Sequence, residues 1–240
     1  MLEYILLGIV QGITEWLPVS SSGHLVIFQE LFNIKANLFY DIWLHLGTLI
    51  VLVFFFYKDI INISRKWILY IIIGSLITGA IGLVFYDILK SFFSNLLVVG
   101  LGLIFTGIIL FLTKNYNGKR ELNKIDSILI GLSQAIAIIP GVSRSGATIS
   151  TGLLRDINKE KAFKFSFLLS IPSILGALLY EGRNISFNIS IEHIVGLLAS
   201  VIVGYLSLKI LFKIVRKRKM HYFSYYCWIA GIIIILIQYI

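Results

Sequence analysis

The sequence has little of what stabilises a secreted or a soluble protein. Of its 240 residues, one is cysteine, three are proline and only 14% are charged. The single cysteine, Cys227, excludes an intrachain disulfide and gives no thiolate metal site. No polar stretch exceeds roughly a dozen residues, which leaves no room for a soluble domain between the apolar runs.

Apolar residues are what the chain has in abundance. They make up 58% of the sequence, and the mean hydropathy is +0.92, outside the range of ordinary soluble domains. A helix needs about 20 residues to cross the core of a bilayer, and the apolar runs have about this length. The runs cover 41–57, 67–86, 92–112, 162–180, 193–212 and 222–240. The alternating pattern of membrane β-strands is absent. We therefore predict an all-α polytopic membrane protein with six transmembrane helices.

The placement of positive charge predicts the orientation. If the six runs cross in turn, all but four of the 21 lysines and arginines fall in loops on one side. Basic loops are retained in the cytoplasm, so we assign that side to the cytoplasm. The run Arg216–Lys219 is placed to contact anionic lipid headgroups, and we expect no nucleic-acid partner. The four exceptions are Lys35, Lys90, Arg144 and Arg183.

Two further segments, 1–33 and 125–154, do not fit single crossings. If 125–154 crossed the membrane once, the basic loops after it would move outside and the charge asymmetry would be lost. Segment 1–33 is too short for two crossings and is interrupted at Pro18, which breaks a helix. We predict that each is a re-entrant helix-loop-helix hairpin, and that the two enter from opposite sides.

The chain then divides into two related halves, 1–113 and 125–240, within a single membrane domain, 1–240. Each half is a hairpin followed by three crossings, and an odd number of crossings makes the halves an inverted repeat. The pattern G-x-x-E…P-V-S-S-S-G in the first half is echoed by G-x-x-Q…P-G-V-S-R-S-G in the second. Inverted repeats with broken helices place a polar site near the middle of the membrane.

The two hairpins carry polar stretches, GITEWLPVSSSGHLV at 12–26 and GLSQAIAIIPGVSRSGAT at 131–148. Hydroxyls at the start of a helix cap free N–H groups, and the positive end of the helix dipole favours an anion there. Arg144 adds a planar fork of donors suited to phosphate oxygens. These features predict a phosphate or diphosphate cradle. Its small residues are Ser20, Ser21, Ser22 and Gly23 in the first stretch and Ser143, Ser145 and Gly146 in the second.

Glu15, Ser21 and His24 add reactivity to this cradle. Three routes stay open: attack by Ser21 with His24 assisting, direct attack by His24, or attack by water with His24 as acid or base. Glu15 either holds a divalent cation or pairs with Arg144 in a structural role. We expect His45 to bond a neighbouring helix, and Gly8 with Gly12 to allow close helix packing.

Two motifs resemble the signatures of the undecaprenyl-diphosphate phosphatases, also called bacitracin-resistance proteins. They are Gln11-Gly-Ile-Thr-Glu15-Trp-Leu-Pro-Val-Ser-Ser-Ser-Gly-His24 and Pro140-Gly-Val-Ser-Arg-Ser-Gly-Ala-Thr148, and the likeness runs nearly end to end. The resemblance implies two re-entrant hairpins and six crossings in the plasma membrane. It also implies a site that faces outside and hydrolyses undecaprenyl diphosphate to the monophosphate and phosphate, which recycles the lipid carrier for peptidoglycan synthesis.

The resemblance also assigns roles to residues. It implies dependence on a divalent cation, Mg²⁺ or Ca²⁺, with Glu15 as the metal ligand, and leaves the oligomeric state open between monomer and homodimer. The implied catalytic residues are Glu15, Ser21, His24 and Arg144, and the implied substrate-binding residues are Gln11, Ser20, Ser22, Gly23, Ser143, Ser145, Gly146 and Thr148. Many members have glutamate where this chain has Gln11, so this chain relies more heavily on Glu15.

A transporter or flippase for an anion or a polyprenyl phosphate is the alternative, because facing re-entrant hairpins also occur in alternating-access proteins. Transport needs the Arg144 cradle but not a proton-transfer group. Since transport alone does not explain Glu15, Ser21 and His24 together, we favour the enzyme.

Overall fold

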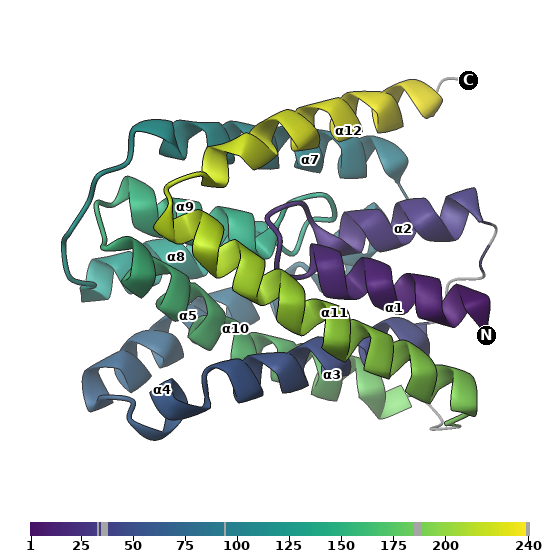
Figure 1. The fold of residues 1–240 in the computed structure, drawn as a ribbon, viewed down its shortest axis with the longest axis horizontal. Coiled ribbons are helices and arrows are strands. Elements are labelled where there is room, and N and C mark those ends of the chain that lie inside the picture. The colour runs from purple at the N-terminus through teal and green to yellow at the C-terminus, as the bar shows by residue number, and fades with distance from the viewer. Residues whose placement is uncertain (33, 35–37, 94, 185–188, 239–240) are drawn as a thin grey trace.

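The computed structural model describes residues 1–32, 34, 38–93, 95–184 and 189–238 (Figure 1). These residues form helices, and their only β-type pairing is an isolated bridge between Arg120 and Ile157. The α-helices are α1 (Leu2–Thr14), α2 (Ser21–Leu31), α3 (Leu38–Phe55), α4 (Tyr57–Ile61), α5 (Arg65–Val84), α6 (Tyr86–Phe92), α7 (Leu96–Leu112), α8 (Lys124–Ile136), α9 (Arg144–Leu154), α10 (Lys159–Glu181), α11 (Ile191–Arg216) and α12 (Phe223–Ile237). Short 3-10 turns cover Thr113–Asn115, Gly182–Asn184 and Met220–Tyr222.

Five of the helices are long and apolar enough to cross a membrane, which confirms a polytopic α-helical membrane protein. They are α5, α7 with its following 3-10 turn, α10, α11 and α12 with its preceding 3-10 turn. The run predicted at 41–57 corresponds to α3, which is also apolar but shorter over the residues searched. Its last turn ends at Phe55, and the short amphipathic α4 follows at once.

The broken segments form two helical hairpins that approach each other from opposite ends of the molecule (Figure 1). α1 stops at Thr14, ahead of Pro18, and α2 restarts at Ser21 with Ser20 as its N-cap. α9 likewise begins at Arg144 with Ser143 as its N-cap. Both connecting turns lie in the middle of the molecule, so residues far apart in the sequence meet there.

The hairpins and long helices pack in a reciprocal pattern between the two halves. α1 packs on α11 and α8 packs on α5, while α3 also contacts α11 and α10 also contacts α5. α7 and α12, the last helix of each half, pack on one another. Each half therefore covers helices of the other, and the largest buried cluster draws on both halves.

Small residues bring α1 and α11 together, as the Gly8 and Gly12 spacing predicts. A Cβ added to Gly8 would lie 2.3 Å from the Gly196 carbonyl oxygen, and one added to Gly12 would lie 2.8 Å from the Gly204 nitrogen. Backbones this close leave no space for a side chain, and such contacts are the usual way that helices associate in a membrane.

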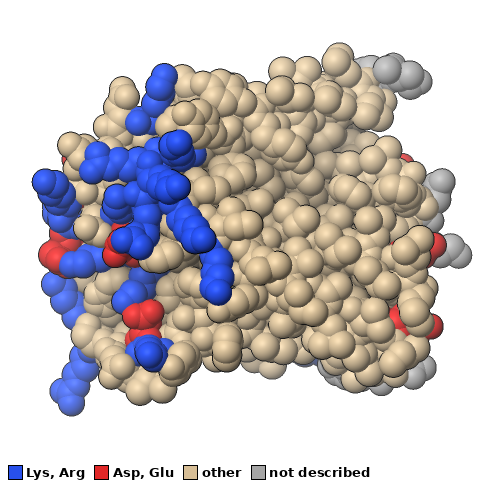
Figure 2. Space-filling model, viewed as in Figure 1, with Lys and Arg blue, Asp and Glu red and all other residues tan. Residues whose placement is uncertain are grey.

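Positive charge gathers at one end of the molecule (Figure 2). At this end the buried carboxylate of Asp126, at the start of α8, accepts hydrogen bonds of 2.8 Å from each of two nitrogens of Arg120. The Arg155 Nε atom, just after α9, donates to the same carboxylate at 3.1 Å. The ion cluster therefore ties together the two ends of the second hairpin.

Candidate functional site

The tips of the two hairpins are joined by an ion pair. Glu15, in the turn after α1, binds the guanidinium of Arg144, the first residue of α9. Beside it, the Ser145 hydroxyl donates to the Leu17 carbonyl at 3.4 Å. Residues 129 positions apart are thus brought together in the middle of the molecule, as the inverted arrangement of the two polar stretches predicts.

The buried carboxylate of Glu15 is the centre of this site. While one oxygen binds Arg144, the other accepts hydrogen bonds from the Ser21 hydroxyl at 2.6 Å and from the Gln11 Nε2 at 3.1 Å. His45 of α3 places its Nε2 3.7 Å from the same oxygen. The carboxylate is thus within reach of a hydroxyl, an amide and an imidazole.

Arg144 is paired through only part of its guanidinium. Nη2 binds Glu15, whereas Nη1 is buried and has no hydrogen-bond partner among the described residues. The guanidinium also lies 5.8 Å from the ring centroid of Trp16, which is fully buried. A buried donor without a partner is costly, and an anionic ligand at this point would satisfy it.

The start of α2 combines a strained cap with accessible hydroxyls. Ser20 has a positive φ of 71°, and its hydroxyl accepts from the Gly23 N–H at 3.3 Å. Ser21 and Ser22 are only partly buried. The Ser21 hydroxyl turns to Glu15 and the Ser22 hydroxyl bonds that of Ser20 at 3.3 Å, so polar groups gather at a helix start, where anions commonly bind.

The start of α9 is built alike but is more deeply buried. The Ser143 hydroxyl caps the Gly146 N–H at 3.1 Å, and the Ser143 N–H donates to the Thr106 hydroxyl at 3.0 Å. Thr148 donates to the Arg144 carbonyl and also bonds Ser166. Because Ser143, Ser145 and Thr148 are engaged within the protein, their contact with substrate stays a prediction.

His24 has a different environment from the one that its predicted assistance to Ser21 would require. No hydrogen bond joins it to Ser21, which turns to Glu15 instead. The Nδ1 atom of His24 bonds the Ser20 carbonyl at 2.8 Å, and its Nε2 bonds the hydroxyl of Tyr226 in α12 at 2.6 Å. The structure therefore places Glu15, rather than His24, against the Ser21 hydroxyl.

Two neighbours of the site were missed in the sequence. His45 was expected to bond another helix, but its Nδ1 bonds the Asp41 carbonyl of its own helix and so turns Nε2 to Glu15. Its position one turn after Asp41, in an apolar run, could have indicated that it belongs to the site. Tyr226 lies in an aromatic stretch, SYYCW, whose composition gives no sign of a link to His24.

The oxygens around Glu15 suit a hard divalent cation that is shared with a substrate. Gln11 Oε1 is buried and has no partner among the described residues, and the Ser21 hydroxyl donates to the same carboxylate oxygen as the Gln11 Nε2. The described residues hold no group of three or more His, Cys, Asp or Glu placed to bind a metal. Mg²⁺ commonly binds through one or two carboxylates plus substrate phosphates, so this donor set fits such a cation but not an all-protein cage.

Comparison with known proteins identifies the family. The bacitracin resistance protein BacA family matches residues 4–233. A protein of Carboxydothermus hydrogenoformans named undecaprenyl-diphosphatase is 44% identical, over 98% of this chain and 97% of its own. Proteins with the same name from Methanobrevibacter smithii and Thermosipho africanus are 40% and 39% identical, over 98% and 97% of this chain and over 96% and 98% of their own. The chain therefore belongs to the bacitracin resistance protein BacA family.

Proposed function

We propose that this protein is an integral membrane phosphatase that hydrolyses undecaprenyl diphosphate to the monophosphate and inorganic phosphate, returning the lipid carrier to cell-wall synthesis. The observation that carries the proposal is the meeting of Glu15, Ser21 and Arg144 at the tips of the two hairpins. The name shared by its relatives, undecaprenyl-diphosphatase, supports the substrate.

In this proposal the terminal phosphate binds between Arg144 and the start of α2. The unpaired Nη1 of Arg144 donates to phosphate oxygens, and the N–H groups and hydroxyls of residues 20–23 complete the cradle. A cation held by Glu15 and Gln11 would neutralise charge on the phosphates. Most of the polyprenyl chain stays in the bilayer beside the helices.

The geometry supports Ser21 as the nucleophile. Its oxygen attacks the terminal phosphorus while its proton passes to Glu15 Oε2, 2.6 Å away, and the bond to the bridging oxygen breaks, so that the lipid monophosphate leaves with the electron pair. Water then attacks the phosphoserine, and the bond between phosphorus and the Ser21 oxygen breaks. Glu15 returns its proton to the Ser21 oxygen, and both protons of the water leave with inorganic phosphate.

We also propose how the protein lies in the plasma membrane. In this arrangement α3 and the five longer helices, α5, α7, α10, α11 and α12, cross the membrane. The hairpins α1–α2 and α8–α9 are re-entrant, and the halves 1–113 and 125–240 form an inverted repeat within one domain. The reciprocal helix pairing and the basic end support this arrangement, with that end in the cytoplasm and the site open to the outside. Since one chain supplies both hairpins, the site does not require a second subunit.

The test is phosphate release from undecaprenyl diphosphate by the purified protein in detergent, with Mg²⁺, with Ca²⁺ and with chelator. Arg144→Ala and Glu15→Gln are compared with Lys90→Ala, which changes an exposed charge far from the site. We expect cation-dependent release that both site variants lower by at least about a hundredfold while the control keeps it. Absence of release from the folded wild-type protein would contradict the proposal and favour the transporter.

A further inference from the structure

We propose that His45 is a ligand of the divalent cation held at Glu15, and that its nitrogen makes the site favour a transition-metal ion, such as Mn²⁺, over Mg²⁺ and Ca²⁺. The inference rests on the proposed phosphatase function, in which Glu15 and Gln11 hold a cation. His45 lies on α3, whereas Glu15 and Gln11 belong to the first hairpin. The Nε2 atom of His45 is 3.7 Å from Glu15 Oε2.

A backbone hydrogen bond determines which nitrogen of His45 faces Glu15. The Asp41 carbonyl, 2.8 Å from Nδ1, can only accept, so Nδ1 carries the hydrogen. In the neutral ring Nε2 then has the lone pair, and no hydrogen bond from the described residues occupies it. A metal-binding histidine almost always donates its other ring N–H to a carbonyl or a carboxylate, which fixes the ring and leaves one nitrogen for the metal.

The contact between His45 and Glu15 brings together two groups that both accept. Because Glu15 forms an ion pair with Arg144 through its other oxygen, the carboxylate is ionised and Oε2 has no hydrogen to donate. A lone pair and a carboxylate oxygen repel each other unless they share a cation. Two ligands that bind one ion through bonds of about 2.0–2.2 Å lie roughly 3–4 Å apart, and the 3.7 Å between Nε2 and Oε2 falls in this range.

Gln11 supplies a third donor. Its Nε2 donates to Glu15 Oε2 at 3.1 Å, and its buried Oε1 has no partner in the part of the chain that the structure describes. A half-turn of the amide exchanges the two atoms and brings Oε1 beside the carboxylate, where a cation satisfies it. The donors are then an amide oxygen, a carboxylate oxygen and an imidazole nitrogen. Three protein ligands with a position left for substrate are typical of a catalytic metal site.

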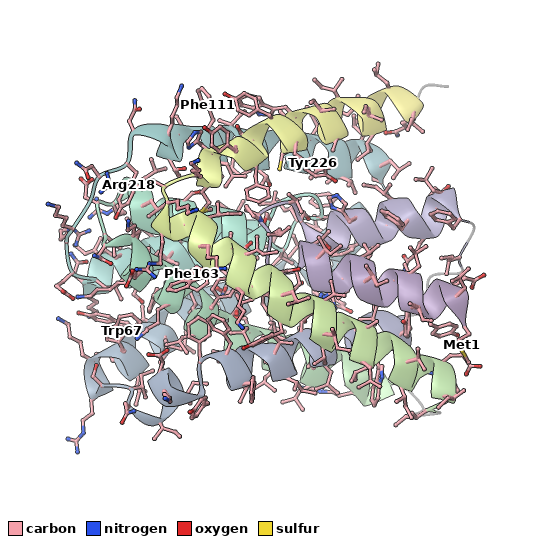
Figure 3. The ribbon with its side chains drawn as sticks, viewed as in Figure 1. Met1, Trp67, Phe111, Phe163, Arg218 and Tyr226 are labelled. Atoms are coloured by element: carbon pink, nitrogen blue, oxygen red, sulfur yellow. The ribbon has the colours of Figure 1, made fainter. Side chains whose placement is uncertain are left out.

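His24, the other histidine near the turn of the first hairpin, is not available in this way. Its Nδ1 bonds the Ser20 carbonyl at 2.8 Å, and its Nε2 bonds the Tyr226 hydroxyl at 2.6 Å. Tyr226 lies on α12, at the opposite edge of the molecule from α3 (Figure 3). Both nitrogens of His24 are therefore engaged within the protein, whereas Nε2 of His45 can bind a metal.

A nitrogen ligand changes which ions bind best. Mg²⁺ and Ca²⁺ take oxygen ligands, whereas imidazole suits transition metals. Mn²⁺ accepts the same oxygens but gains more from a nitrogen. His45→Gln offers an oxygen in place of the nitrogen, so we expect it to lower the affinity for Mn²⁺ at least about tenfold, since losing even a group that only orients a ligand commonly costs that much. The affinity for Ca²⁺ should change by less.

The test detects the nitrogen directly and needs no turnover. Mn²⁺ and inorganic phosphate are added to the purified protein in detergent, and pulsed EPR measures the coupling between the ion and nearby nitrogen nuclei. We expect the ¹⁴N coupling of a bound imidazole, which changes to that of ¹⁵N when the histidines are ¹⁵N-labelled. The coupling should vanish in His45→Gln and persist in His221→Gln, the matched control beside the basic run Arg216–Lys219. It should also persist in His24→Gln.

Thermal unfolding shows whether His45→Gln is folded. If it is not, the assignment is made by elimination, because the chain has four histidines and the coupling should survive His24→Gln, His193→Gln and His221→Gln. Three outcomes would overturn the inference: a wild-type protein that binds Mn²⁺ without nitrogen coupling, a coupling that survives in folded His45→Gln, or equal losses of Mn²⁺ and Ca²⁺ affinity. In the first case His45 and Glu15 form a simple ion pair.

The two proposals can fail separately. A wild-type protein that shows the histidine coupling but releases no phosphate from undecaprenyl diphosphate would contradict the proposed function and leave His45 as a metal ligand. Cation-dependent release of phosphate by a protein without the coupling would overturn this inference alone.

Discussion

Ser20 combines a backbone angle that few residues with side chains adopt with a hydroxyl that caps α2. Its φ of 71° is sparsely populated for any residue except glycine, and such strain persists only where the surroundings enforce it. The same residue directs its carbonyl to His24. The strained angle therefore serves both the helix start and the orientation of the histidine.

Substitutions at Ser20 should separate the strain from the cap. Ser20→Ala loses the cap and keeps the strain, so we expect a loss of about 1 kcal/mol in stability. Ser20→Gly loses the same hydroxyl but tolerates the positive φ, so it should unfold at a higher temperature than Ser20→Ala. The comparison is made by thermal unfolding in detergent, and equal unfolding temperatures would contradict the assignment of strain.

The protein should not tolerate even a substitution of Arg144 that conserves its charge. Arg144→Lys keeps the positive charge but has no planar fork, so it cannot bind Glu15 and present a second nitrogen to phosphate at once. We expect phosphate release to fall by about a hundredfold with an unchanged unfolding temperature. Activity close to that of the wild-type protein would show that charge alone suffices.

At the residue scale, the sequence predicted the members of the site better than their partners. Two polar stretches in an apolar chain identified Glu15, Ser21 and Arg144, because polar groups in a membrane need partners or a function. The direction of each side chain was beyond sequence reasoning. One predicted route had His24 assist Ser21, yet the Ser21 hydroxyl bonds the Glu15 carboxylate and His24 bonds the Tyr226 hydroxyl.

Among the elements, α1 and α11 pack closely enough for a small substitution to test the contact. Gly12→Ala would place a methyl group 2.8 Å from the Gly204 nitrogen and 2.9 Å from the Ser200 carbonyl oxygen. We expect a loss of roughly 1–3 kcal/mol from overpacking. The matched control is Gly79→Ala in α5, where a Cβ meets nothing within 4 Å, and it should leave the unfolding temperature unchanged or higher. If Gly12→Ala left the unfolding temperature unchanged, the two helices would be free to move apart.

The ion cluster at the start of α8 should be equally sensitive. Asp126→Asn removes a buried charge on which Arg120 and Arg155 converge, and we expect a loss of roughly 3 kcal/mol. Glu121→Gln, which breaks the exposed pair with Lys161, is the control and should cost less than about 1 kcal/mol. Similar effects of the two substitutions on thermal unfolding would argue against the cluster as a structural clamp.

The ends of the helices could be predicted from the sequence where a capping residue or a proline marks them. Pro18 predicted the break in the first hairpin, and Ser20 and Ser143 are the predicted helix caps. α3 was less predictable, because the apolar run 41–57 continues past the point where the helix ends at Phe55. Hydropathy measures how well a segment tolerates lipid, whereas a helix end depends on the hydrogen bonds of its last turn.

At the scale of the whole molecule, the proposed orientation can be tested with thiols. In a Cys227→Ser background, Lys119→Cys and Lys217→Cys lie at the basic end, and Lys90→Cys lies on the opposite side of the proposed membrane. A membrane-impermeant maleimide applied to intact cells should label only Lys90→Cys, and lysis should expose the other two. Labelling of Lys217→Cys but not Lys119→Cys in intact cells would mean that 125–154 crosses the membrane instead of returning.

Because His24 binds Tyr226 and Glu15 binds Arg144, the site draws on both ends of the chain. During synthesis the first hairpin leaves the ribosome long before either partner exists. A chain that stops before α9 therefore carries Glu15, Ser21 and His24 without Arg144 or Tyr226. We expect such a chain to release no phosphate, because the charge that binds the substrate arrives only with the second hairpin.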